Sequence, residues 1–275
     1  MKENSILKEI SYMLKDVLCV ILSLTIYIFI QGLSAGILVN NFKFSSTTAN
    51  IAGSILCIVV LFPLFYLPVK KKLIENELRL ELKINKKSLV WVIIAGVSSC
   101  MLLNTLVMLT QINNIVTSYD SVAEVLYGAD ILPVCVQMII VAPLIEELLF
   151  RGIIYQRFKS AFAYVAHSAG LKKYPQIMAA LFSAAIFGFL HGNLLQGIYA
   201  FLLGMILAFI MEKYQSLLPC ILFHMSANLI SVLGTKTGLL MFIFTSKSSL
   251  IIYSAISGLL LVISLVKLAI GRCAE

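Results

Sequence analysis

Four polar side chains in the second half of the chain are of the types that can carry out hydrolysis: Glu146, His191, His224 and Asn228. A carboxylate can take a proton from water, and an imidazole can position or polarise that water. A histidine N–H and an asparagine amide can donate hydrogen bonds to the oxyanion of a tetrahedral intermediate. The sequence therefore offers a complete set for water-mediated hydrolysis, provided that the fold brings these residues together.

Glu146 lies in residues 141–158, VAPLIEELLFRGIIYQRF, a run otherwise apolar enough to sit in a bilayer. A charged residue at the centre of a membrane helix costs about 2.5–3.5 kcal/mol, so these charges must be paired, hydrated or used. Glu147 and Arg151 stand four apart on one helical face and can neutralise each other. Glu146 is turned about 100° away and has no such local partner. We therefore predict that Glu146 does the chemistry and that Glu147 and Arg151 support the site.

The other polar groups also recur at helical spacing. Phe187 and His191 are four apart in SAAIFGFLHGN, and His224 and Asn228 are four apart in CILFHMSAN, about 6 Å along a helix. A single buried His or Asn in a membrane protein more often makes an interhelical hydrogen bond, which contributes about 0.6 kcal/mol. For the set taken together we favour function, since ionisable residues inside a membrane are functional candidates. Phe187 is predicted to shape the site by packing.

The elements that must position these residues are membrane helices. Hydrophobic residues make up 60% of the 275-residue chain and charged residues 12%, and the mean hydropathy is +1.00. These values predict an all-α, polytopic helix bundle in a lipid bilayer, forming one membrane domain over residues 1–275 with the catalytic motifs in 141–233. The net charge of +8 comes from short basic segments flanking apolar runs, which indicates membrane topology and no nucleic-acid partner.

Eight spans are predicted. Their expected ranges are 17–39, 51–69, 89–110, a fourth from about 131, 176–191, 194–211, 217–233 and 249–270. Straight fourth and fifth helices would leave Glu146 and His191 roughly 15 Å apart in depth. We therefore expect the fourth helix to extend to near Phe158, and the fifth to begin inside a cytoplasm-facing cavity.

The basic loops predict the orientation. Residues 70–88 are rich in Lys and Arg, whereas 111–130 contain neither, so the first loop and both termini are expected in the cytoplasm and the second loop outside. The alternating stretch 78–84 is typical of an extended segment at the membrane surface. Residues 237–245 are apolar but too short to span, and could be re-entrant.

The remaining candidates are assigned to structure. The six cysteines are scattered singly through apolar segments, without CxxC spacing, so we interpret them as reduced packing residues. His167 lies in a cytoplasmic connection with no partner motif and is not predicted to act in catalysis.

Three motifs in order, Glu146-Glu147-xxx-Arg151, Phe187-xxx-His191 and His224-xxx-Asn228, resemble those of the CPBP family, the CAAX proteases and bacteriocin-processing enzymes also called the Abi family. The resemblance covers about a third of the chain. It implies an intramembrane endopeptidase with an eight-helix core, related to the Ras-converting CAAX endopeptidase. It also implies that Glu146 and His191 activate water and that His224 and Asn228 hold the oxyanion.

The resemblance leaves metal dependence open. Members are generally called metalloproteases, and Glu146, His191 and His224 would form a zinc site with an open position. It equally permits a metal-free mechanism with glutamate as base, which we favour. The HExxH motif of zincins is absent.

The predicted substrate is a small peptide or a membrane-attached protein, in a bacterial cell membrane; a prenylated substrate is not implied. The alternative is a non-catalytic bacteriocin immunity or membrane interaction protein.

Overall fold

A computed structural model describes residues 2–75, 86–111, 130–169, 174–238 and 245–271. The described residues form helices joined by short connections, with no strand among them. Short π-helical segments, labelled η, interrupt several of the helices. The elements are α1 (Lys2–Ala35), η1 (Gly36–Asn41), α2 (Ser46–Leu61), η2 (Phe62–Tyr66), α3 (Leu67–Glu75), α4 (Lys86–Thr110), α6 (Ile131–Cys135), η4 (Val136–Val141), α7 (Ala142–Glu147), η5 (Leu148–Ile154), α8 (Tyr155–Ala169), α9 (Tyr174–Phe189), α10 (Leu194–Tyr214), α11 (Leu217–Lys236) and α13 (Lys247–Ile270).

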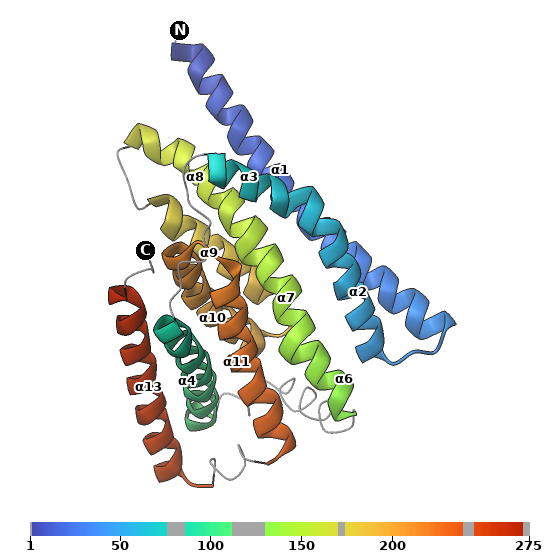
Figure 1. Ribbon diagram of the computed structural model, residues 1–275, viewed down its shortest axis with the longest axis vertical. Coiled ribbons are helices and arrows are strands. Elements are labelled where there is room, and N and C mark those ends of the chain that lie inside the picture. The colour runs from blue at the N-terminus through green and yellow to red at the C-terminus, as the bar shows by residue number, and fades with distance from the viewer. Residues whose placement is uncertain (1, 76–85, 112–129, 170–173, 239–244, 272–275) are drawn as a thin grey trace.

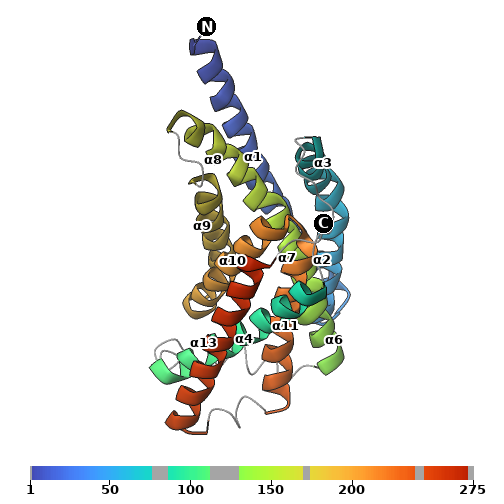
Figure 2. The same ribbon diagram turned by 60° about the vertical axis from the view of Figure 1, so that its left-hand side comes forward.

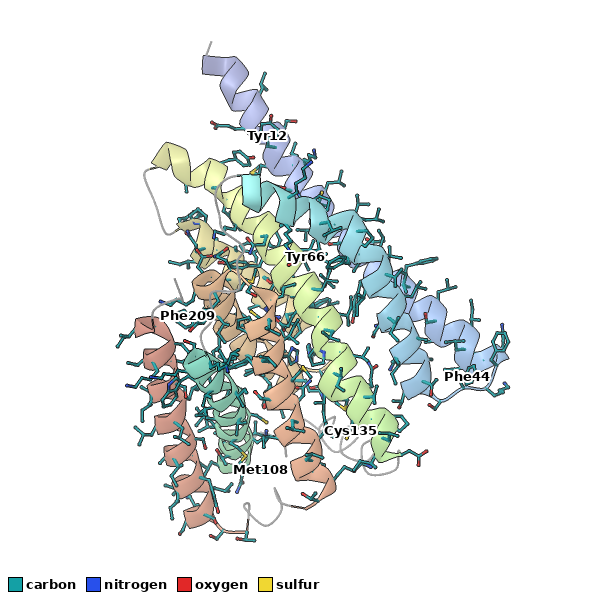
Figure 3. The ribbon with its side chains drawn as sticks, viewed as in Figure 1. Tyr12, Phe44, Tyr66, Met108, Cys135 and Phe209 are labelled. Carbon is teal, nitrogen blue, oxygen red and sulfur yellow. The ribbon has the colours of Figure 1, made fainter. Side chains whose placement is uncertain are left out.

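Within the described ranges, 7 helices are long and apolar enough to cross a membrane. They are Glu9–Asn41, Ser46–Lys71, Lys86–Thr110, Ile131–Tyr164, Leu194–Tyr214, Leu217–Lys236 and Lys247–Ile270. The prediction of an all-α polytopic bundle is confirmed. Large apolar side chains such as Phe44 and Phe209 project from its outside, where lipid would contact them (Figure 3).

The expected fifth span differs from the others in length. It is α9, with 16 residues, which at 1.5 Å per residue rises about 24 Å and falls short of a hydrocarbon core of about 30 Å. If α9 starts at one membrane surface, the turn that follows it therefore ends short of the other surface. This places His191, which the turn carries, at depth.

The fourth membrane element is one long rod. The segments α6, η4, α7, η5 and α8 follow each other without a break through the middle of the molecule (Figure 1). The prediction that this helix extends to near Phe158 is confirmed, and α8 continues to Ala169. Glu146 is about 22 Å along the rod from Ile131 and about 27 Å from Tyr164, near the middle of the candidate span.

Glu146 and His191 lie at similar depths because of the position at which α9 starts. Its first residue, Tyr174, meets Phe162 of α8 at 6.1 Å between ring centroids. From this contact, Glu146 lies about 24 Å down the rod and His191 about 25 Å down α9 and its turn. The first residue of α9 contacts the ring of Phe162, and the expectation that α9 begins inside a cytoplasm-facing cavity stays a prediction.

One end of the bundle gathers charged side chains, and we call it the basic end. Arg157 of α8 binds Asp16 of α1 at 2.9 Å, and Lys159 binds Glu212 of α10 at 2.6 Å. Lys213 donates to the carbonyl of Ala269 in α13 at 2.9 Å. The start of α1 and the end of α13 therefore lie on the same side (Figures 1 and 2). This arrangement agrees with termini that share one face, while their cytoplasmic orientation stays a prediction.

Close helix contacts depend on small residues. A Cβ added at Gly96 of α4 would lie 2.1 Å from Ser226 Oγ of α11, and one added at Gly188 of α9 would lie 2.5 Å from the Gly197 carbonyl oxygen of α10. Membrane helices associate through such close backbone approach, because no hydrophobic driving force separates helix from lipid. These contacts hold α4 against α11 and α9 against α10.

Several predicted features lie outside the described residues. They are the alternating stretch 78–84, nearly all of the loop 111–130, most of 237–245, and Cys273. His167 falls within α8, but its side chain is also outside the description. The described cysteines, Cys19, Cys57, Cys100, Cys135 and Cys220, are free, as expected.

Candidate active site

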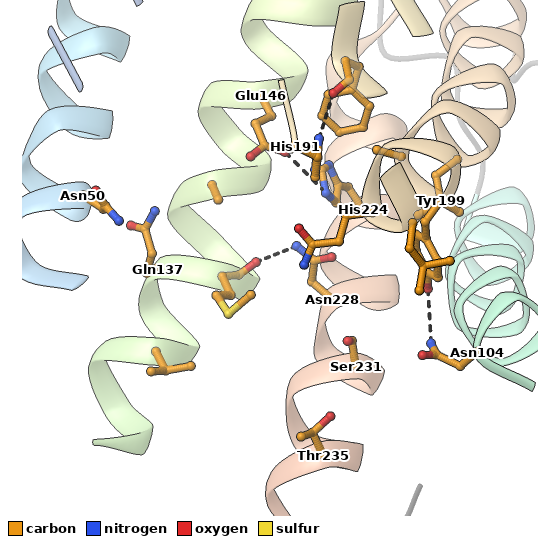
Figure 4. A pocket seen from close by; sticks show the side chains of 18 of the residues that line it. Asn50, Asn104, Gln137, Glu146, His191, Tyr199, His224, Asn228, Ser231 and Thr235 are labelled. Carbon is orange, nitrogen blue, oxygen red and sulfur yellow. Dashed lines mark hydrogen bonds and ion pairs between the residues drawn. The ribbon is translucent and has the colours of Figure 1, made fainter. Parts of the chain in front are cut away.

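A cavity of about 500 Å³ runs along the rod between α2, α4, α10 and α11. Glu146, Phe187, His191, His224 and Asn228 are among the residues that line it, and Figure 4 shows Glu146, His191, His224 and Asn228 close together. The rod, α9 with its turn, and α11 thus bring the four predicted catalytic residues to one cavity. Glu146 and Asn228, which are more than 80 positions apart in the sequence, therefore line the same cavity.

The two adjacent glutamates have different environments. Glu146 keeps 20% of its side-chain surface exposed and lines the cavity, whereas Glu147 is 0% exposed. Glu147 pairs with Arg151 at 3.0 Å, as the four-residue spacing predicts. A general base must contact water, and of these two glutamates only Glu146 is exposed to the cavity.

His224 connects the two glutamates. Its Nδ1 lies 2.8 Å from Glu147 Oε1, and its Nε2 lies 3.6 Å from Glu146 Oε2. Glu147 thus neutralises Arg151 and also fixes the ring plane of His224, an arrangement common where an imidazole is held for catalysis or metal binding. The sequence did not reveal this second contact, since the two residues lie on different helices.

Arg151 is held by rings as well as by charge. Its guanidinium carbon lies 4.7 Å from the ring centroid of Phe187 and 5.9 Å from that of Phe150. A Cβ added at Gly204 of α10 would lie 3.3 Å from Arg151 Nη2, so glycine leaves the room that the guanidinium needs. Cation–π contacts of this kind contribute on the order of 2 kcal/mol when desolvated. The packing role predicted for Phe187 therefore includes holding the buried cation.

His191 is anchored through the same phenylalanine. Its Nδ1 lies 2.7 Å from the backbone carbonyl oxygen of Phe187, and the two rings meet edge to face at 4.7 Å. If Nδ1 carries the proton, Nε2 presents its lone pair. The side chains of Glu146, His191 and His224 gather at the same end of the cavity (Figure 4).

Asn228 bonds to the rod. Its Nδ2 donates to the carbonyl oxygen of Met138 at 2.7 Å. In η4 the N–H of Ala142 reaches five residues back to Gln137, and the next residue, Pro143, has no N–H to give to Met138. Asn228 supplies the missing donor. One of its two amide hydrogens is thereby used in structure, which leaves the other for a substrate.

The cavity walls contain polar residues that the sequence analysis missed. Among them are Asn50, Gln137, Gln196, Tyr199, Ser231 and Thr235. A signal was present on α11, where His224, Asn228, Ser231 and Thr235 follow one another at spacings of four, three and four, which is one polar face on an apolar helix. Gln137 stands nine residues before Glu146 on the rod and has no comparable repeat.

The zinc alternative was tested against the side chains. The donor types of Glu146, His191 and His224 suit zinc. In the described part of the chain, however, no three His, Cys, Asp or Glu side chains are grouped so that they could hold a metal ion. The residues as placed do not fit a three-ligand site, and no step below is routed through a metal.

Chelation provides the direct measurement of metal dependence. For a glutamate base acting on free water, we expect purified protein in detergent to keep its cleavage rate after exhaustive chelation, with no stoichiometric zinc by elemental analysis. Loss of cleavage that zinc alone restores would overturn this expectation. Magnesium and calcium added back separately are the controls for ions that only stabilise the fold.

The similarity to known proteins lies in the segment that contains the site residues. A family model described as type II CAAX prenyl endopeptidase Rce1-like matches residues 128–230, the part that holds all three motifs. This segment of the chain is therefore similar to the CAAX protease family. No curated protein and no solved structure matches it. This similarity supports a CAAX-type intramembrane protease at the level of the family, and the long apolar helices together with it support an integral membrane protein.

Proposed function

We propose that this protein is a CAAX-type intramembrane endopeptidase in which Glu146 and His191 activate water, while His224 and Asn228 hold the oxyanion. The observation that carries the proposal is the meeting of these residues at one cavity, with Glu146 20% exposed beside a fully buried Glu147–Arg151 pair. The substrate is a small peptide or a membrane-associated protein. The site is in a cell membrane, which we propose is bacterial.

The reaction begins where Glu146, His191 and His224 line the cavity. Glu146 takes a proton from a water molecule that His191 Nε2 positions by accepting a hydrogen bond, and the hydroxide oxygen attacks the carbonyl carbon. The carbonyl π electrons move to oxygen, which becomes the oxyanion. Glu146 then gives its proton to the leaving nitrogen, the oxyanion re-forms the carbonyl, and the C–N bond breaks with its electron pair going to nitrogen. The products are a carboxylic acid and an amine, and the acid then gives its proton to the amine, which leaves a carboxylate and an ammonium group.

His224 can donate to the oxyanion only through Nε2, because its Nδ1 faces Glu147 at 2.8 Å. We propose that the ring is doubly protonated. The buried group of Glu146, Glu147, Arg151 and His224 is then electrically neutral, which is the condition for keeping charges inside a low-dielectric bundle. Glu147 supports this state by accepting hydrogen bonds from both Arg151 and His224.

Asn228 has a proposed catalytic role as an oxyanion donor and a structural role through its hydrogen bond to Met138, and mutation can separate the two. Asn228→Ala removes an oxyanion donor, which typically costs about 10²–10³ in rate, but it also leaves the Met138 carbonyl unpaired. In a Pro143→Ala background, the new N–H of residue 143 can serve Met138 instead. We expect Asn228→Ala to remain slow in this background while its thermal stability recovers.

Cleavage rates and thermal stability of Asn228→Ala, Pro143→Ala and the double variant decide the matter. Recovery of both rate and stability in the double variant would show that Asn228 only ties α11 to the rod. Pro143→Ala alone is the matched control for changes in the rod itself.

The experiment that tests the function compares peptides in membranes and culture medium from cells expressing the wild type or Glu146→Ala. A hydrolase predicts fragments with new termini in the wild type and their uncut precursors in the variant. Thr25→Val, on the exposed surface of α1, is the control for expression and insertion. Identical peptide profiles in all three strains, at equal protein levels, would refute the proposal.

A further inference from the structure

The cavity occupies only one half of each helix that lines it. Its lining residues on α11 run from His224 to Thr235, and those on α4 are Asn104 and Val107, near the helix end at Thr110. On the rod the lining runs from Val134 to Glu146, and on α2 it is limited to Thr47 and Asn50 in the first turns. All of these positions lie between the catalytic residues and the end opposite the basic end.

The other half of the bundle is filled. Beyond Glu146 toward the basic end, the rod and its neighbours bury large apolar side chains almost completely. These include Leu149, Ile153, Ile154, Leu207, Ile210 and Phe223, each 0% exposed. The buried pair of Glu147 and Arg151 lies in this half as well. The catalytic residues therefore have a packed floor on the basic side and an open cavity on the other.

The charges at the two ends are unequal. Described lysines and arginines at the basic end are Lys15, Lys70, Lys71, Lys86, Lys87, Arg157, Lys159, Lys213 and Lys267, and those at the opposite end are Lys43, Lys236 and Lys247. Lys and Arg accumulate on the cytoplasmic side of membrane proteins. This bias predicts that the basic end is the cytoplasmic one, and most of the residues that line the cavity lie on the side of Glu146 away from that end.

We infer that the active site opens to the outer side of the membrane, so that it takes exported or outer-leaflet peptides rather than cytoplasmic proteins. This inference rests on the proposed function for its substrate. The walls add a chemical constraint, since beyond Glu146 and the two histidines every lining residue is uncharged. An unpaired charge would be costly to bring into such a cavity, so the entering segment is uncharged near the scissile bond.

The depth of the site sets the length of that segment. Glu146 lies about 22 Å along the rod from Ile131, and an extended chain covers about 3.3 Å per residue. About seven extended residues therefore separate the scissile bond from the outer end of the rod. Amides such as Asn50, Gln137 and Gln196 are placed along the cavity to hydrogen-bond the peptide backbone.

Sidedness is measurable with single cysteines in an otherwise cysteine-free protein that still inserts. We expect Ser231→Cys and Thr235→Cys to react with a membrane-impermeant maleimide equally in intact and permeabilised cells. Lys86→Cys, at the exposed start of α4, should react only after permeabilisation. Ile256→Cys, on the exposed apolar face of α13, is the control for lipid-facing positions and should not react. External modification of Ser231→Cys should also block cleavage.

The outcomes separate the two proposals. Reaction of Ser231→Cys and Thr235→Cys only in permeabilised cells, in protein that still cleaves, would overturn the outward opening and leave the protease intact. External reaction without any Glu146-dependent cleavage would support the outward opening and refute the proposed function. Reaction of Lys86→Cys in intact cells would contradict the orientation itself.

Discussion

The variant Glu146→Gln is expected to be a folded, inserted protein that no longer cleaves. Gln keeps the shape and hydrogen-bonding capacity of Glu but cannot accept the proton from water. Removal of a general base typically costs 10²–10⁴-fold. The Glu146 carboxylate lies 3.6 Å from His224 Nε2, and 20% of the side-chain surface is exposed, so little packing is lost. Single-turnover rates with purified protein would measure the loss, and thermal unfolding in detergent would check the fold.

This result also separates the enzyme from a non-catalytic immunity or interaction protein. A binding protein would tolerate Glu146→Gln, because the substitution leaves shape and polarity in place. Normal cleavage by the variant would mean that another group is the base, and normal biological activity without cleavage would favour binding. Thr25→Val serves again as the control for protein amount.

Loss of stability, rather than of chemistry alone, is expected for Glu147→Gln. The change leaves the Arg151 guanidinium without its carboxylate in a fully buried position, and breaking a buried pair typically costs about 3–5 kcal/mol. The double variant Glu147→Gln with Arg151→Met removes both charges and should recover much of this stability. Urea or thermal unfolding in detergent, with cleavage rates for the four combinations, gives the coupling between the two residues.

The His224 contact predicts that activity recovers less than stability in the double variant. A glutamine oxygen at residue 147 can still accept from His224 Nδ1, so the ring stays oriented, but a neutral partner no longer favours the doubly protonated ring. Glu147→Ala with Arg151→Met is the matched variant that loses the orientation too, and it should be slower still. A double variant no more stable than Glu147→Gln would show that the pair is not the source of the loss.

Much of the fold could be predicted because lipid imposes simple rules. Apolar runs of sufficient length gave helices at the expected positions, such as Lys86–Thr110 and Lys247–Ile270, within about three residues. The exception is α9, whose apolar run is long enough to be taken for a span. Only its tertiary setting shows that it starts beside Phe162 and ends at depth.

The candidate site was partly visible in the sequence for a similar reason. Residues four apart share a helical face, so the Glu147–Arg151 pair and the His224–Asn228 alignment could be inferred. Contacts between different helices could not. The bond from Glu147 to His224 and the bond from Asn228 to Met138 depend on how α11 lies against the rod.

The side from which the cavity opens was the least predictable feature. Charge patterns orient the helices, but they do not say which half of a bundle is packed. That depends on side-chain volumes, with large residues such as Phe150 and Met211 filling one half and smaller polar residues such as Ser231 lining the other.

The central claim is that water activated by Glu146 hydrolyses a peptide bond in this cavity. The most direct measurement is a single-turnover cleavage in ¹⁸O-labelled water, using wild-type protein and a peptide found to accumulate uncut in the Glu146→Ala strain. The account predicts that one ¹⁸O atom enters the new carboxylate in the first turnover, and that Glu146→Gln gives no product on that timescale. An unlabelled carboxylate from the first turnover, or equal product from the variant, would contradict it.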